Sequence, residues 1–137
     1  MKKIISVLFI SLFATLLLGG CSSGKLSDAF DKETVEKSAK QVIEYMNNAE
    51  YDKVTTMFQE DLQEQLSAEV LKDAVDKTYS DAGEFKEYKN TAVLGQKVKT
   101  TKEDSAVAVV VAKYENQNVT FTISFNTDME LIGLYMK

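Results

Sequence analysis

Apolar and polar residues alternate without a break in Val119-Thr120-Phe121-Thr122-Ile123-Ser124-Phe125. Successive side chains on a strand point to opposite faces, so the apolar side chains share one face and the hydroxyl side chains share the other. This alternation is typical of an antiparallel strand that buries one face. It predicts a sheet that has a hydrophobic core on one side and water on the other.

The flanking sequence supplies the neighbours of this strand. Ser105–Tyr114 is rich in Val and Ala on both faces, which predicts a central strand whose small alanine side packs closely against another element. Phe85–Thr100 predicts a long, irregular strand that bends at Gly95. Met129–Met136 predicts a closing strand. Short polar turns join these strands, so the sequence predicts a meander of neighbouring antiparallel strands.

Three helices are predicted ahead of the sheet. Apolar residues at helical spacing indicate a helix from about Ser27 or Asp31 to Asn47 and a short helix over Tyr51–Met57. Ser67 is a good N-cap for a third helix, and Gly83 is a suitable stop after it. The apolar stripe of that helix is predicted to comprise Val70, Leu71, Ala74, Val75 and Thr78. Each helix has only one apolar stripe, so the helices must cover one face of the sheet in an α+β fold.

The composition of the 137-residue chain excludes several classes of function. All 16 basic residues are Lys, against 21 acidic residues, and the net charge of -5 argues against nucleic-acid binding. The chain contains no His, which excludes a Ser-His-Asp triad and an imidazole metal site. Without Arg it has no bidentate clamp for carboxylate or phosphate groups. We therefore expect no metal site and no cofactor.

The N-terminus has the features of a bacterial lipoprotein signal. Two lysines precede the apolar run Ile4–Leu18, which is too short to span a bilayer and suits a signal peptide. The following Leu18-Gly19-Gly20-Cys21 resembles a lipobox, and the resemblance implies cleavage before Cys21 and acylation of its sulfur. Two or more acyl chains hold a protein on a membrane. The alternative is an ordinary signal peptide followed by a chance Cys.

The lipobox interpretation divides the chain into three parts. Residues 1–20 form the signal peptide, residues 21–30 the lipidated Cys and a short tether, and residues 31–137 a single α+β domain. The tether Ser22–Ser27 reaches roughly 20 Å at about 3.3 Å per residue, which keeps the domain close to the membrane. We expect a protein at the extracytoplasmic face of the bacterial cell membrane, held there by the lipid on Cys21.

Four motifs of packing and turn residues point to a known family. They are Tyr51-Asp52-Lys53-Val54 with Phe58, Leu66-Ser67-Ala68-Glu69-Val70-Leu71, Gly83-Glu84-Phe85 and Phe125-Asn126-Thr127-Asp128-Met129-Glu130-Leu131-Ile132-Gly133-Leu134. Over Thr34–Met136 the chain resembles the bacterial family catalogued as domain of unknown function 3887, in the nuclear-transport-factor-2-like, or cystatin-like, superfamily. The resemblance implies N-terminal helices packed on a curved four-stranded antiparallel meander sheet. Met129 stands where a Gly is usual, and the short strand common between the helices is not evident.

The resemblance implies a pocket between the curved sheet and the helices. Our first hypothesis is therefore non-catalytic binding of a small apolar or amphipathic ligand, or an accessory role of that kind. The aromatic residues expected to line the pocket are Phe58, Tyr79, Phe85, Phe121 and Tyr135. A fully packed core is the alternative, because any sheet core requires apolar residues at alternate positions.

Two further hypotheses stay open. A protein–protein interaction module at the cell surface would present a polar sheet face of Lys113, Thr120, Thr122 and Ser124, and the resemblance also allows a homodimer through the sheet. An isomerase or dehydratase would use a buried carboxylate or Tyr, for which the candidates are Tyr45, Tyr79, Tyr114, Tyr135, Asp73 and Asp76.

The three hypotheses predict different structures. An enzyme requires a buried titratable group beside a cavity, and a ligand binder requires a cavity without one. An interaction module requires a filled core and an exposed apolar patch.

Overall fold

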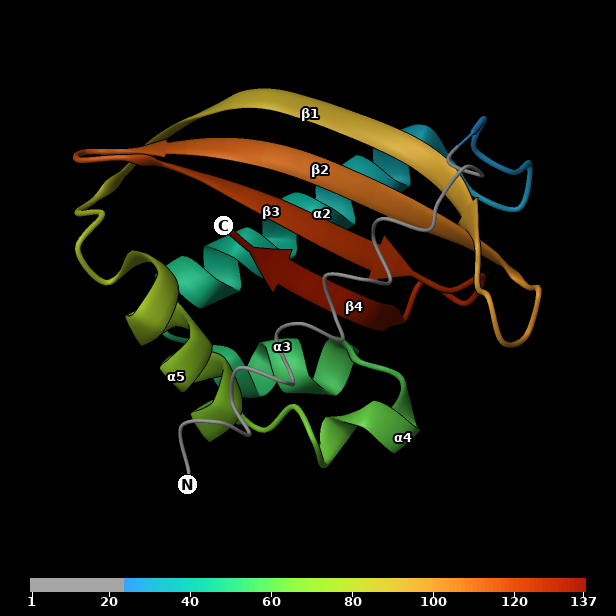
Figure 1. Cartoon of the computed structure of the whole chain (residues 1–137), viewed down its shortest axis with the longest axis horizontal. Helices are drawn as coiled ribbons and strands as arrows, with labels where there is room; N and C mark the ends of the chain where they lie inside the picture. Colours follow the sequence, from blue (N-terminus) through green and yellow to red (C-terminus); the bar gives the residue numbers. More distant parts are fainter. Residues whose placement is uncertain (1–23) are drawn as a thin grey trace.

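Helices and strands form two successive blocks of the chain (Figure 1). The computed structural model describes residues 24–137, so Cys21 and the predicted signal peptide lie outside the described residues. The helices are α2 (Lys32–Asn47), α3 (Tyr51–Met57), α4 (Glu60–Gln63) and α5 (Ala68–Tyr79). The strands are β1 (Phe85–Lys97), β2 (Asp104–Tyr114), β3 (Asn118–Phe125) and β4 (Leu131–Met136). The predicted α+β fold is confirmed, in an arrangement consistent with the nuclear-transport-factor-2-like one.

The strands form one antiparallel sheet in the order β1-β2-β3-β4, so the predicted meander is also confirmed. In the register of this sheet, Ala108 of β2 lies between Val93 of β1 and Ile123 of β3. Side chains paired across strands share a face, and Ala108 and Ile123 are fully buried. This row therefore belongs to the side of the sheet that faces the core, called here the inner face.

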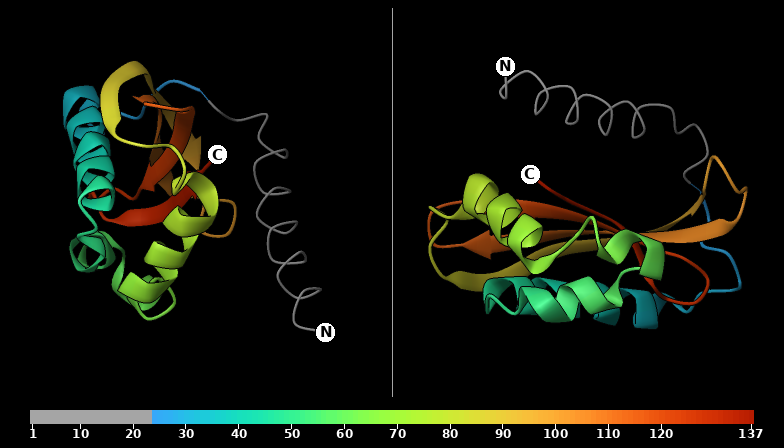
Figure 2. Two further views of the ribbon diagram at one scale, coloured as in Figure 1. Left: turned by 90° about the vertical axis from the view of Figure 1, so that its left-hand side faces the viewer. Right: turned by 90° about the horizontal axis from the view of Figure 1, so that it is seen from below.

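Helix α2 packs along the inner face, as the left view of Figure 2 shows. Its buried stripe comprises Val35, Ala39, Val42, Ile43 and Met46. Beneath it, β2 contributes three fully buried alanines, Ala106, Ala108 and Ala112. Small side chains allow the helix and the strand to approach closely, which confirms the prediction for the alanine side of this strand. Asp31 caps the helix by accepting a hydrogen bond from Thr34 N at 2.9 Å.

Helix α5 confirms the predicted cap but corrects the predicted stripe. Ser67 Oγ accepts a hydrogen bond from Val70 N at 3.4 Å, whereas the Val70 side chain is 45% exposed. The buried residues are Leu71, Val75 and Tyr79, which follow one another at i, i+4 and i+8. The face that packs is therefore rotated away from Val70, because Tyr79 at the end of the helix enters the core. The structure also contains the four-residue helix α4, which the sequence analysis did not predict.

Gly95 does not bend β1, contrary to our prediction. The irregularities of this strand lie between Phe85 and Glu87 and between Tyr88 and Asn90. Gly95 is required for a different reason, since a Cβ atom there would lie 2.2 Å from the carbonyl oxygen of Lys25. The glycine thus gives the N-terminal segment room to lie against the sheet.

Two details concern the departures from the family pattern. Met129 adopts a positive φ of 60°, which explains why Gly is usual at this turn position. The short strand between the helices, which the sequence did not reveal, exists as a single parallel bridge between Phe58 and Leu131. Gln59 N donates to Leu131 O at 3.0 Å within this bridge. Among residues 24–137 no helix is long and apolar enough to cross a membrane.

Candidate functional site

Five aromatic rings form a continuous row on the inner face of the sheet, from α5 to the side covered by α2. The row runs from β3 through α5 to β2 and β1 and comprises Phe121, Tyr79, Tyr114, Phe85 and Tyr88. Successive ring centroids are 4.8 to 5.7 Å apart in tilted or edge-to-face geometry. Such contacts stabilise the core beyond the area that they bury. We call these residues the aromatic row.

The hydroxyl groups of the row differ in their hydrogen bonding. Tyr114 donates to Asn47 Oδ1 at the end of α2, and Tyr88 donates to the carbonyl oxygen of Lys40 at 3.3 Å. The Tyr79 hydroxyl is buried and makes no hydrogen bond of normal geometry with a described residue, although the Tyr114 hydroxyl is its close neighbour. Tyr79 as a whole is only 7% exposed. A buried polar group without a partner costs about 1–3 kcal/mol, so Tyr79 holds an unused donor inside the protein.

Burial raises the pKa of all three hydroxyls above the ordinary value of 10.0, so they stay protonated further into the alkaline range. It raises the pKa of Tyr114 to about 12, although the hydrogen bond to Asn47 opposes the shift. It also raises the pKa of Tyr88 to about 12, with a smaller contribution from Glu44. The pKa of Tyr79 rises further, through burial first and through the neighbouring Tyr114 and Tyr51 second. These phenols can donate hydrogen bonds, but they are poor proton acceptors at neutral pH.

The structure brings together only part of the predicted ligand-binding set. Tyr79, Phe85 and Phe121 belong to the aromatic row. Phe58 is also buried in the core, 1% exposed, where it meets the start of β4. Tyr135 pairs with Thr122, points away from the core and is 37% exposed. All five therefore cannot line one cavity, because the strand pleat places Tyr135 on the opposite face.

The carboxylates that we considered for catalysis lie on the surface. The Asp73 side chain is 61% exposed and pairs with Lys77 at 2.7 Å, and the Asp76 side chain is 51% exposed and pairs with Lys72 at 2.6 Å. Tyr45 is partly buried at the edge of the core, with the Lys53 ammonium 5.2 Å from its ring centroid. Ser105 is the one buried polar or charged residue among those described. This arrangement offers a general acid or base no buried carboxylate in residues 24–137.

Two hollows formed by the described residues are open to solvent. One, of about 550 Å³, lies over α2 and Tyr88 and is lined by charged side chains that include the pair Lys40–Glu36 at 2.8 Å. The other, of about 180 Å³, lies beside Gly95. Neither hollow contains a residue of the predicted ligand-binding set. Between α5 and the sheet the space is occupied by the aromatic row.

Among residues 24–137 no helix covers the second face of the sheet, called here the outer face (Figure 1). The strand register assigns to it Ala92 and Leu94 of β1, Val107, Val109 and Val111 of β2, Thr120, Thr122 and Ser124 of β3, and Tyr135 of β4. Leu94 is 39% and Tyr135 is 37% exposed. The predicted hydroxyl residues are on this face, but β2 and β1 make it partly apolar. The sequence analysis did not predict that Leu94 is on this face, because the alternation of side chains cannot be followed through an irregular strand.

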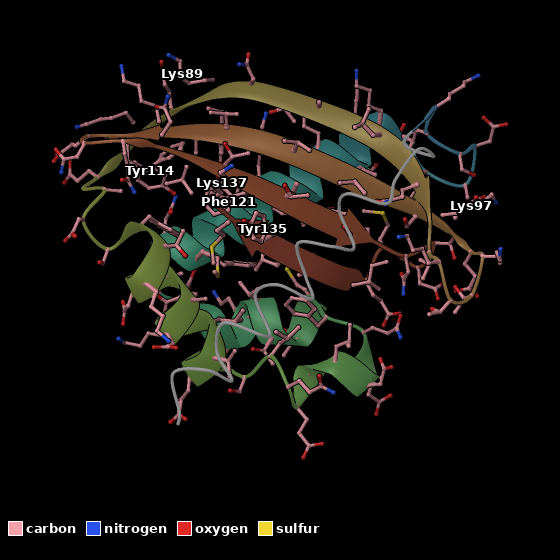
Figure 3. All side chains as sticks on the ribbon, in the orientation of Figure 1. Lys89, Lys97, Tyr114, Phe121, Tyr135 and Lys137 are labelled. Carbon is pink, nitrogen blue, oxygen red and sulfur yellow. The ribbon has the colours of Figure 1, made fainter. Side chains whose placement is uncertain are left out.

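Acidic and basic side chains are distributed unequally between the helices and the sheet. Residues 28–84, which hold the helices, carry 15 acidic and 6 basic side chains. Residues 85–137, which hold the sheet, carry 6 acidic and 7 basic side chains. The acidic character of the chain therefore resides in the helical layer, and the sheet is close to neutral. In Figure 3 the labelled Lys89, Lys97 and Lys137 are distributed around the sheet.

Comparison with known proteins identifies the domain. Residues 39–134 match the family described as Protein of unknown function (DUF3887). The chain belongs to this family. It is also similar to a solved structure, described as the NMR structure of a protein from Ruminococcus gnavus ATCC 29149, with 32% sequence identity and a TM-score of 0.72. That similarity covers 83% of this chain and 97% of the other. No curated protein matches the chain.

The DUF3887 match contains the whole aromatic row and most of the outer face. It begins at residue 39 within α2, so it excludes the N-terminal segment that lies against Gly95. The aromatic row and the outer face are thus features of the DUF3887 domain, whereas the contact at Gly95 involves chain that precedes it.

Proposed function

We propose that this DUF3887 protein is a lipid-anchored accessory protein of the bacterial cell surface that binds a protein partner through its outer sheet face. The exposed apolar residues of that face, Leu94 and Tyr135, carry the proposal. A filled core combined with such a patch is the arrangement expected of an interaction module. We also propose that the chain is a member of the nuclear-transport-factor-2-like superfamily and that the sequence ending at Cys21 is a lipobox.

The partner that suits this face presents an apolar surface. Val109 and Val111 lie half-buried in the middle of the face, between Leu94 on one side and hydroxyl residues on the other. The sheet layer is nearly neutral while the helical layer is strongly acidic. An acidic partner is therefore repelled less by the sheet than by the helices, and this difference favours docking on the outer face.

Photocrosslinking in the native host tests the proposal. A photoreactive phenylalanine at Tyr135 should capture a defined protein, and the same residue at Val70, which is exposed on α5, should not. Leu94→Glu should abolish the Tyr135 adduct without unfolding the domain, because Leu94 lies outside the buried core. Equal adducts from both positions would contradict a specific docking face. An adduct between two copies of the chain would mean that the partner is a second copy.

The anchor has a separate test. Cys21→Ala should move the protein from the membrane fraction to the soluble fraction, because the acylation site is lost. Cys21→Ala remaining as firmly membrane-bound as the parent would contradict the lipoprotein assignment. The control is the parent protein in the same fractionation.

The unpartnered Tyr79 hydroxyl favours a second candidate function. A small, largely apolar ligand with one hydrogen-bond acceptor could bind between α5 and the sheet and accept from Tyr79. Because the aromatic row fills this space, such a ligand requires α5 to shift. Native mass spectrometry of protein purified gently from its host should then show a bound mass of small-molecule size that denaturation removes. A clean apo mass would count against this candidate and would leave the outer face as the binding surface.

A further inference from the structure

The N-terminal segment of the described structure is fastened to the edge of the sheet. Gly24 N donates to Gly95 O at 3.0 Å, and Gly95 N donates to Gly24 O at 2.9 Å. Ser27 Oγ donates to Asp104 Oδ2 at 3.0 Å, and Leu26 packs against the core. We call Gly24–Ser27 the N-terminal clasp. The free tether is consequently shorter than the predicted Ser22–Ser27, because the clasp is already part of the fold.

The clasp determines where an anchor at Cys21 must lie. Three residue steps separate Cys21 from Gly24, which allows a reach of about 10 Å. The clasp runs antiparallel to β1, so the amino end of Gly24 faces the end of β1 and the following turn, residues 98–103. Figures 1 and 2 place the clasp and this β1–β2 turn at the same end of the molecule.

The β1–β2 end is less acidic than the helical layer. Its exposed lysines are Lys25, Lys97, Lys99 and Lys102, and its exposed carboxylates are Asp28 and Glu103. The nearby Asp104 is already paired, with Lys97 Nζ at 2.9 Å and with Ser27. A Lys close to an anionic leaflet is attracted to it. The strongly acidic helical layer, in contrast, is repelled by such a surface.

We propose that the protein stands end-on at its own membrane, with the β1–β2 turn and the N-terminal clasp against the anionic headgroups. This inference rests on the proposed lipid anchor at Cys21. Strand β2 leads away from that end from Asp104 to Tyr114, a length of about 33 Å at about 3.3 Å per residue. Figure 3 shows Lys97 and Tyr114 at these opposite ends. The outer face is thus held upright above the membrane, and Tyr114, in the middle of the aromatic row, lies at the end of β2 that is far from it.

Paramagnetic attenuation of amide signals tests the orientation. The chain from Cys21 to Lys137, which holds every described residue, is joined through its single Cys to a maleimide lipid in nanodiscs. The nanodiscs contain phosphatidylglycerol and a lipid with a gadolinium chelate on its headgroup. Amides of residues 98–103 should lose most of their intensity, and amides of the β2–β3 turn, residues 115–117, should retain theirs. Equal attenuation of the two turns in the parent protein would overturn the inference.

Three variants show whether the clasp causes the orientation. Gly95→Ala places a Cβ 2.2 Å from Lys25 O and should release the clasp, so that the difference between the turns disappears. Gly133→Ala is the matched control, because its Cβ meets only Ser124 at an ordinary 3.5 Å. Gly24→Pro removes the amide that donates to Gly95 O and leaves the sheet residue itself unchanged. It should abolish the difference between the turns in the same way, and it keeps the test valid if Gly95→Ala destabilises the fold. Persistence of the difference in both clasp variants would contradict the role of the clasp.

The mass of the Cys21 peptide from the native host separates this inference from the proposed function. An unacylated Cys21 would overturn the proposed lipid anchor. The nanodisc result would still test the orientation, because the lipid there is attached chemically. Conversely, an acylated Cys21 with equal attenuation of both turns would keep the anchor and overturn the end-on orientation.

Discussion

Replacing Tyr79 by Phe should make the protein more stable. The substitution removes only the hydroxyl oxygen, and the ring keeps its contacts with Tyr114 at 5.3 Å and with Phe121 at 5.7 Å. The hydroxyl is buried without a described partner, and an unsatisfied buried donor costs about 1–3 kcal/mol. We therefore expect Tyr79→Phe to raise the free energy of unfolding by about 1 kcal/mol or more.

Tyr114→Phe provides a matched comparison with the opposite sign. Its hydroxyl donates to Asn47 Oδ1, so the same substitution breaks a hydrogen bond and leaves the Asn47 acceptor unpaired. We expect a loss of about 1–2 kcal/mol. Tyr135→Phe should change little, because that side chain is 37% exposed on the outer face.

Urea unfolding and calorimetry of the three variants measure the effect. At this chain length about 1 kcal/mol corresponds to a Tm shift of about 4 °C, so the Tyr79 and Tyr114 variants should move in opposite directions by readily measured amounts. A Tyr79→Phe protein destabilised as much as Tyr114→Phe would refute the reasoning. It would mean that the Tyr79 hydroxyl has an acceptor in solution, such as a buried water or a retained ligand.

Three further predictions concern the N-cap of α5, the packing of the alanines of β2 against α2, and the ionisation of the buried Tyr114 hydroxyl. Ser67→Ala removes the cap of α5 and should lower the free energy of unfolding by about 0.5–1 kcal/mol in urea, and no loss would contradict the capping role. Ala108→Val overpacks the contact with α2 and should cost about 1–3 kcal/mol. The same change at the exposed Ala92 should stay within about 0.5 kcal/mol, and equal effects at the two sites would show that α2 does not pack as described. Because burial raises the pKa of Tyr114 from 10.0 to about 12, the unfolded chain ionises first, so this contribution to stability is complete below pH 10 and declines as the pH rises toward 12. Urea unfolding followed at several alkaline pH values measures this decline, and constant stability across that range would contradict the burial of the phenol.

The prediction of the fold succeeded where local patterns decide the structure. Alternation over Val119–Phe125 determined which side chains of β3 are buried, because the strand pleat has a period of two residues. The cap residue Ser67 located the start of α5, since it satisfies an amide group only three residues away. The family match over residues 39–134 agrees with the resemblance carried by the packing and turn motifs. These features depend on neighbours in the sequence, so the sequence alone was sufficient.

The candidate sites were predicted less well because they depend on long-range contacts. The bulges of β1 change which side chains of that strand face outward, and they placed Leu94 on the exposed face without any signal in its own sequence. Nothing local to Tyr79 indicates that its hydroxyl lacks an acceptor, because the possible acceptors come from distant elements. The same holds for Tyr135, whose face is determined by its register with Thr122.

The sequence by itself therefore determined the order of helices and strands, the buried face of the sheet and the composition that excludes histidine and arginine chemistry. Only the tertiary structure decided that Gly95 receives the N-terminal clasp instead of bending its strand, and that the aromatic row fills the space between α5 and the sheet. The physical reason is that local periodicity and capping act over a few residues. A hydrogen bond between Gly24 and Gly95 or a ring contact between Tyr79 and Phe121 exists only once the folded chain brings distant residues together.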